Sequence, residues 1–192
     1  MYTEGTVSRP ARQLGHPLDA DALYDCAVRA LAHRSRTEAE LRRHLTPRAA
    51  LPADVEAVLG RLREHGYIDD ARLARAATSY QHEVFHHGRE RALRDLVARG
   101  IGKAVASQAV NHDYAALDEM ALLEAFLAKK RLSTPATPRQ AGNLFRKLRL
   151  AGFSFQVCRR QLGVWHLPVE WLDDALDDAL DAALEIAADP DI

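Results

Sequence analysis

The residues best suited to chemistry form the run His82-Glu83-Val84-Phe85-His86, which matches the HExxH pattern of zinc peptidases. Two histidines four residues apart share one helix face, where both can bind zinc while the glutamate acts as a general base. Catalytic zinc also needs a third protein ligand, and no downstream glutamate on a dedicated helix offers one. Gly88 then ends the helical pattern at once. We therefore predict a polar, partly basic helix end and no metal site, with a metallopeptidase as the disfavoured alternative.

Other catalytic patterns are missing from the sequence. Glycines occur singly and no GxxxxGK[ST] run is present, so nothing indicates an ATPase or a kinase. No nucleophile elbow marks a serine hydrolase. Cys26 and Cys158 lie far apart without CxxC spacing, which predicts reduced thiols among apolar neighbours. We expect a protein that is not an enzyme, with no catalytic residue and no cofactor.

Charged residues are divided unevenly along the chain. Residues 1–166 hold all 26 Lys and Arg, whereas residues 167–192 hold nine Asp and Glu and no Lys or Arg. Such asymmetry often marks contact with nucleic acid or a charged partner. A solvated face with cations at helix ends is the alternative. The candidate contact residues are Arg42, Arg43, Arg94, Lys129, Lys130, Arg131, Arg139, Arg146, Lys147, Arg149, Arg159 and Arg160.

Helices must position these residues, because apolar side chains recur at spacings of three and four without a sustained alternation of period two. Ala, Leu, Arg and Glu dominate, and these are strong helix formers. Single glycines and prolines mark the helix ends. The expected helices cover about residues 21–33, 35–46, 52–65, 69–85, 89–99, 102–110, 117–132, 138–151 and 154–162.

Local signals predict particular caps and core residues. Asp21 is the expected cap of the first helix, and Ser35 with Glu38 has the spacing of a capping box at the second. Four aromatic residues on apolar stripes are expected in the core. These are Tyr80, Phe126, Phe145 and Phe153.

The helical pattern recurs with a period of about 45 to 50 residues, three helices at a time. In the best internal match, Leu96, Gly100, Ile101 and Val105 correspond to Leu148, Gly152, Phe153 and Val157. The predicted fold is therefore all-α: tandem three-helix repeats in an elongated, curved array, followed by a C-terminal amphipathic acidic helix. The predicted parts are a flexible N-terminal arm (1–20), three repeats (21–68, 69–113 and 114–166) and the acidic helix or tail (167–192).

Neither membrane insertion nor export is indicated by the sequence. No stretch approaches the roughly 20 consecutive apolar residues of a membrane span. The first 19 residues are polar, carry Pro10 and Pro17, and lack the apolar core of a signal peptide. A cytoplasmic location is expected.

Three stretches of the repeats resemble the RecX family. They are Ser35-Arg36-Thr37-Glu38-Ala39-Glu40-Leu41-Arg42-Arg43-His44-Leu45, Leu62-Arg63-Glu64-His65-Gly66-Tyr67-Ile68-Asp69-Asp70-Ala71-Arg72-Leu73-Ala74, and Ala98-Arg99-Gly100-Ile101 with its echo Leu150-Ala151-Gly152-Phe153-Ser154. The resemblance implies a regulator that binds RecA and the RecA–single-stranded DNA filament, within the filament groove. It further implies restraint of filament growth, ATP hydrolysis and strand exchange in recombination and SOS repair. DNA as a direct partner stays open, and a monomer is expected.

Two features depart from this family pattern. Residues 47–50 lack the glycine turn of the later repeats, and the acidic stretch after Leu167 is not expected of the family. A second function also fits part of the chain. Residues 37–70 are consistent with a helix-turn-helix whose wing would follow Gly66, as in a winged-helix transcription regulator. The helical pattern of residues 71–85 tells against that alternative.

Overall fold

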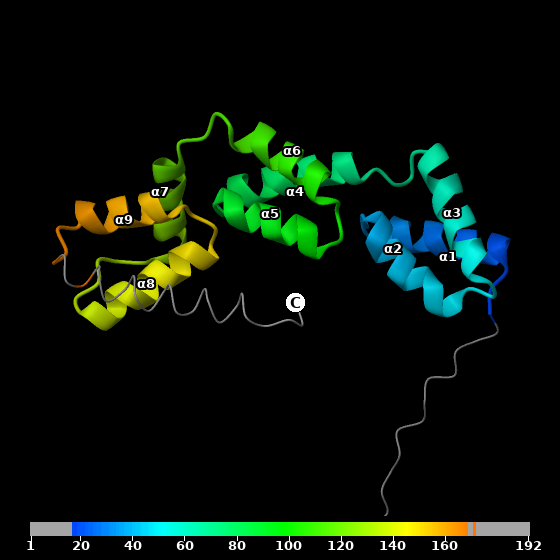
Figure 1. Cartoon of the computed structure of the whole chain (residues 1–192), viewed down its shortest axis with the longest axis horizontal. Coiled ribbons are helices and arrows are strands. Elements are labelled where there is room, and N and C mark those ends of the chain that lie inside the picture. Colours follow the sequence, from blue (N-terminus) through cyan, green and yellow to red (C-terminus); the bar gives the residue numbers. More distant parts are fainter. Residues whose placement is uncertain (1–16, 169–170, 172–192) are drawn as a thin grey trace, which may run out of the picture. The chain divides into compact units, whose positions relative to one another are not determined.

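The predicted all-α fold is confirmed for residues 17–168 and Trp171, which the computed structural model describes (Figure 1). This part of the chain holds nine α-helices, one short 3-10 helix and a single isolated bridge between Leu18 and Ala49. The elements are α1 (Ala20–His33), α2 (Glu38–Leu45), η1 (Thr46–Arg48), α3 (Pro52–Glu64), α4 (Asp70–Glu83), α5 (Arg89–Ala98), α6 (Lys103–Tyr114), α7 (Glu119–Lys130), α8 (Pro138–Leu150) and α9 (Phe155–Val164).

The chain divides into two compact units, residues 1–69 with α1–α3 and residues 70–192 with α4–α9. Buried side chains form one cluster in the first unit and two in the second, one of them within residues 74–110 and the other within residues 122–162. The predicted N-terminal arm and acidic helix lie outside the described residues, apart from a few positions beside them. The predicted repeat boundaries stay predictions.

Both predicted caps in the first unit are wrong by two residues. Asp19, in extended conformation, caps α1 by accepting a hydrogen bond from the N–H of Ala22 at 2.9 Å, so Asp21 lies inside the first turn. The capping box of α2 is formed by Thr37 and Glu40. Ser35 with Glu38 and Thr37 with Glu40 both have the spacing of a capping box, so the sequence pattern alone does not separate them. In the structure the second pair forms the box, and Thr37 is buried.

The internal match between the second and third predicted repeats is visible in the backbone of the second unit. Gly100 and Gly152 have φ of 88° and 93°, a region that favours glycine. In both turns the next residue donates its N–H to a carbonyl five residues earlier, from Ile101 to Leu96 at 3.1 Å and from Phe153 to Leu148 at 3.2 Å. The same hydrogen bonding closes both helices and brings Ile101 and Phe153 into the core.

The predicted core is largely confirmed, with one error. Phe126, Phe145 and Phe153 are buried, but Tyr80 is 53% exposed. The buried stripe of α4 consists of Ala74 and Thr78, so Tyr80 projects away from it and packs edge-on against Phe85. Both cysteines are free thiols, Cys158 fully buried and Cys26 half-buried.

The hairpin that a winged helix needs does not follow Gly66. Gly66 does turn the chain, with φ of 70°. After Ile68, however, α4 begins at Asp70 and continues to Glu83. No strand follows within the described residues, so the structure gives the winged-helix alternative no wing.

Candidate functional site

The predicted contact residue Arg42 forms ion pairs within the first unit. Its Nε lies 2.8 Å from Glu56 Oε1, and one terminal nitrogen lies 2.9 Å from Glu38 Oε1. These hydrogen bonds raise the pKa of Arg42 and lower that of Glu56. Arg42 therefore braces α2 against α3, whereas the neighbouring Arg43 is exposed to solvent.

Arg94 and Arg149 hold α5 against α8 inside the second unit. Arg94 donates to the carbonyl of Leu150 at 2.9 Å. Arg149 lies 3.2 Å from the carboxylate of Glu90 and also donates to the carbonyl of Phe153. Because these guanidinium groups satisfy backbone carbonyls, they are weaker candidates for contact with a partner than their charge alone indicates.

The remaining nine candidates are exposed, and eight of them lie in the second unit, around α7, α8 and α9. Lys129 donates to the carbonyl of Val84 and lies 5.8 Å from the ring centre of Phe85. Arg146 donates to Asn143 at 3.2 Å. These eight exposed cations, all on the three-helix group α7–α9, are called the basic surface below. Its members are Lys129, Lys130, Arg131, Arg139, Arg146, Lys147, Arg159 and Arg160.

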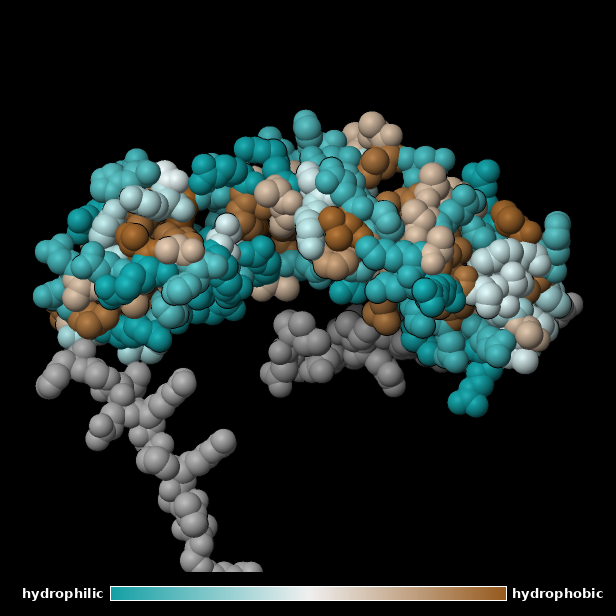
Figure 2. Space-filling view, turned by 180° about the vertical axis from the view of Figure 1, so that it is seen from behind, coloured by the Kyte–Doolittle hydropathy of each residue, from teal (hydrophilic) through white to brown (hydrophobic). Residues whose placement is uncertain are grey.

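A hollow of about 680 Å³ lies beside this basic surface, between α4–α5 and α7–α8. Lys130 and Lys147 line it together with Arg91 and Asp95, which pair with each other at 3.5 Å. Apolar patches also interrupt the mainly hydrophilic surface (Figure 2). The hollow therefore combines cations with apolar side chains. The apolar side chains are Phe85, Phe126, Leu132, Leu150 and Ala151.

His87 also lines this hollow but adds no positive charge near neutral pH. Burial, reinforced by the nearby Arg91, lowers its pKa to about 4. Its ring stacks on Phe85 with the centres 5.3 Å apart, and Nδ1 lies 2.6 Å from the side-chain oxygen of Gln81. Neutral His87 therefore needs Nδ1 to carry the hydrogen that it donates to Gln81.

The HExxH run does not present its two histidines on one helix face. α4 ends at Glu83, and His86 adopts a φ of 54°. The ring of His82 packs edge-on against Tyr114, while Nδ1 of His86 lies 3.0 Å from the carbonyl of His82. In the part of the chain that the structure describes, no group of three or more His, Cys, Asp or Glu could hold a metal ion.

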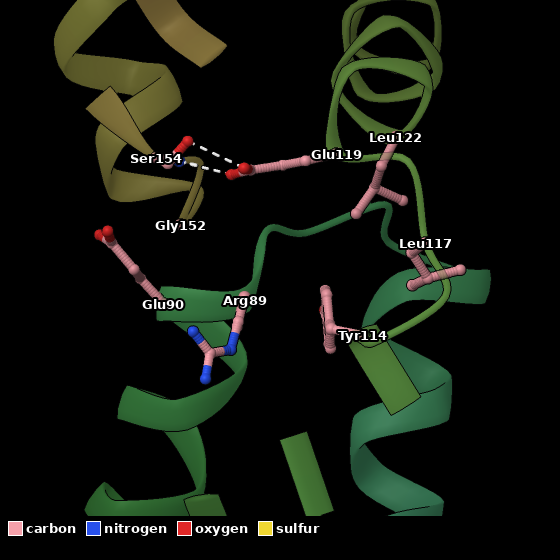
Figure 3. Close-up of a pocket in the computed structure, with 8 residues that line it drawn as sticks. All are labelled: Arg89, Glu90, Tyr114, Leu117, Glu119, Leu122, Gly152 and Ser154. Atoms are coloured by element: carbon pink, nitrogen blue, oxygen red, sulfur yellow. Dashed lines mark hydrogen bonds between the residues drawn. The ribbon is translucent and has the colours of Figure 1, made fainter. Parts of the chain in front are cut away.

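A second, smaller hollow of about 210 Å³ shows contacts that sequence analysis missed (Figure 3). From the start of α7, the carboxylate of Glu119 accepts hydrogen bonds from the N–H of Ser154 at 2.5 Å and from its hydroxyl at 2.8 Å. Ser154 also caps α9. Glu119 thus links the first turn of α7 to the N-terminus of α9. No local pattern in the sequence indicates this contact.

Gly152 lines the smaller hollow and touches the backbone at the start of α5. The N–H of Gly88 donates to the carbonyl of Ala151 at 2.8 Å, and that of Glu90 donates to the carbonyl of Gly152 at 3.1 Å. A Cβ atom at Gly88 would lie 2.2 Å from the Gly152 oxygen. The sequence shows these glycines only as helix ends, but they also allow two segments of backbone to touch.

The fold is thus a series of three-helix groups, and one of these groups carries eight exposed cations. A family model described as RecX, first three-helix domain, matches residues 24–62. The regulatory protein RecX of Leptothrix cholodnii is 31% identical over 136 residues, covering 71% of this chain and 84% of that protein. That of Vibrio vulnificus is 28% identical over 141 residues, covering 72% and 89%. The chain belongs to the RecX family.

Solved structures agree at the level of the fold. RecX from Lactobacillus salivarius superposes with a TM-score of 0.63 at 18% identity, covering 76% of this chain and 97% of that one. A second crystal structure of regulatory protein RecX gives a TM-score of 0.64 at 21% identity, covering 73% and 71%. Within residues 17–168, no helix has the length and apolar character needed to cross a membrane.

Proposed function

We propose that this chain binds RecA and the RecA–single-stranded DNA filament and restrains filament growth, ATP hydrolysis and strand exchange. Membership of the RecX family carries the proposal, because the relatives are named regulatory proteins. On this proposal the partner of the chain is RecA, a protein that assembles on single-stranded DNA. The basic surface around α7–α9 supports this function, because exposed cations attract DNA phosphates and acidic protein surfaces.

The experiment is RecA ATP hydrolysis on single-stranded DNA with this protein added in substoichiometric amounts. We expect the steady-state rate to fall, because one bound regulator that blocks filament growth affects many RecA subunits. Binding of the protein to duplex DNA without RecA provides the comparison. An unchanged ATPase rate, together with sequence-selective binding to operator-like duplexes, would support a transcription regulator and contradict the proposal.

A further inference from the structure

The 680 Å³ hollow leaves large apolar side chains uncovered beside two lysines. Phe85 is 37% exposed and Leu150 is 57% exposed, and Lys130 and Lys147 line the same space. The acidic side chain there, Asp95, already interacts with Arg91 at 3.5 Å and with the side-chain amide of Gln81 at 2.9 Å. The surface is thus complementary to a segment that alternates leucine with carboxylate.

The C-terminal sequence of the same chain has this composition. Residues 167–192 contain nine acidic residues and no Lys or Arg. Within them, leucines recur every four residues at positions 172, 176, 180 and 184, with aspartates between them. Charge and apolar content therefore match the hollow on both counts.

The described chain leads from α9 onto the group of helices that forms one wall of the hollow. Trp165 and Leu167 pack against the buried cluster of α7–α9, and Phe126 of that cluster lines the hollow directly. Even at the short rise of a helix, residues 169–187 cover about 28 Å, close to the diameter of a small domain. The segment is therefore long enough to cross this group of helices.

We propose that residues 169–187 dock in this hollow in cis, with their leucines on Phe85 and Leu150 and their carboxylates beside Lys130 and Lys147. Apolar contact decides whether the segment docks, because screened surface ion pairs contribute little each. The lysines fix where it lies. Docking covers two cations of the basic surface, so the segment competes with a partner of that surface. This competition, unlike the docking itself, rests on the proposed function.

Hydrogen exchange followed by mass spectrometry on the full chain tests docking without RecA. The variants Leu150→Asp and Lys130→Glu with Lys147→Glu should each speed exchange of amides in residues 172–187 by about tenfold. Arg139→Glu with Arg159→Glu, also exposed and outside the hollow, is the matched control and should change nothing there. Equal exchange in the wild type, the hollow variants and the control would overturn docking. Protection lost on dilution would assign the hollow to the segment of a second copy and overturn docking in cis.

The competition is tested separately with Leu176→Asp combined with Leu180→Asp, which leaves the hollow intact. This variant should inhibit RecA ATP hydrolysis at a several-fold lower concentration than the wild type. Inhibition at the same concentration, with exchange in residues 172–187 accelerated, would overturn the competition. If neither protein affects RecA, the proposed function fails, whereas the exchange measurement still decides docking.

Discussion

At the scale of single residues, Gly88 and Gly152 lie where two backbone segments touch. Because the atoms that a Cβ at Gly88 would meet are backbone atoms, they cannot turn aside as the tip of a side chain can. Gly152 also has φ of 93°, which strains any other residue. Glycine is required at both positions for reasons of space and conformation.

Gly88→Ala should therefore destabilise the second unit, by about 1–3 kcal/mol, the usual cost of overpacking a close contact. Urea unfolding monitored by circular dichroism measures the change. Gly163→Ala is the matched control, because its added Cβ meets no atom within 4 Å. The control should be neutral or stabilising by up to about 1 kcal/mol. Equal unfolding midpoints for Gly88→Ala and the control would show that the backbone contact can relax.

His87 should make stability depend on pH. Its pKa falls from 6.5 to about 4 on folding, mainly through burial. The folded state thus holds the proton less tightly than the unfolded state. The contribution to stability is complete above about pH 6.5 and is lost as the pH falls through 4. The unfolding midpoint should decrease over this window.

The variant His87→Asn isolates this effect from the titration of carboxylates. Its unfolding midpoint should fall less than that of the wild type between pH 7 and pH 4. His112→Asn, at an 80% exposed position of the same unit, is the control. Parallel pH profiles for the wild type and His87→Asn would contradict burial of a neutral imidazole.

At the scale of elements, the helices differ in how they use their cations. Arg42 of α2 forms an ion pair with Glu56 of α3. Arg94 of α5 and Arg149 of α8 donate hydrogen bonds to backbone carbonyls. α8 and α9 also carry Arg139, Arg159 and Arg160 on exposed positions. These last three are the clearest test of the basic surface, because they lie outside the hollow.

Reversing Arg139, Arg159 and Arg160 to Glu should weaken inhibition of RecA on the order of tenfold, since each exposed charge contact is worth below about 1 kcal/mol. Titrating the variant in the RecA ATPase assay measures this loss. Folding should persist, because exposed substitutions change stability by about ±0.5 kcal/mol. Arg29, Arg75 and Lys103, also exposed, give a control with the same change in net charge when reversed. Identical losses in both variants would mean that net charge matters and this surface does not.

At the scale of the whole molecule, a basic body is joined to an acidic C-terminal stretch, and the net charge is only −1. Contacts between exposed charges are screened over about 10 Å at 0.1 M salt. The overall charge therefore says little about binding, whereas the charge of each part decides which partners it attracts.

The protein concentration needed for half-maximal inhibition of RecA should rise with salt concentration. Binding of cations to DNA phosphates releases counterions, which added salt opposes, and salt also screens contacts between exposed charges. The rate of RecA alone at each salt concentration is the reference. The reversed variant of Arg139, Arg159 and Arg160 should show a shallower salt dependence than the wild type. Inhibition that is independent of salt would point to an apolar contact in place of a basic one.

The helices and most of the core follow from the amino-acid sequence. Apolar spacing of three and four is a local property, so it predicted the helices and the burial of Phe126, Phe145 and Phe153. The glycine turn repeated at Gly100 and Gly152 was equally visible, because φ preferences act within a few residues. Family motifs supplied the proposed partner, which helix periodicity alone could not indicate.

The roles of the polar residues and of the glycines at close contacts depend on which helices pack together. Whether an arginine faces solvent or a carboxylate depends on a neighbouring helix, which separated Arg42 and Arg149 from Arg159 and Arg160. The hydrogen bonds of Glu119 to Ser154 and the contact of Gly88 with Gly152 join residues far apart in sequence. The prediction that Tyr80 is buried was wrong for the same reason. Spacing shows which side chains share a helix face, but the neighbouring helices decide which of them are covered.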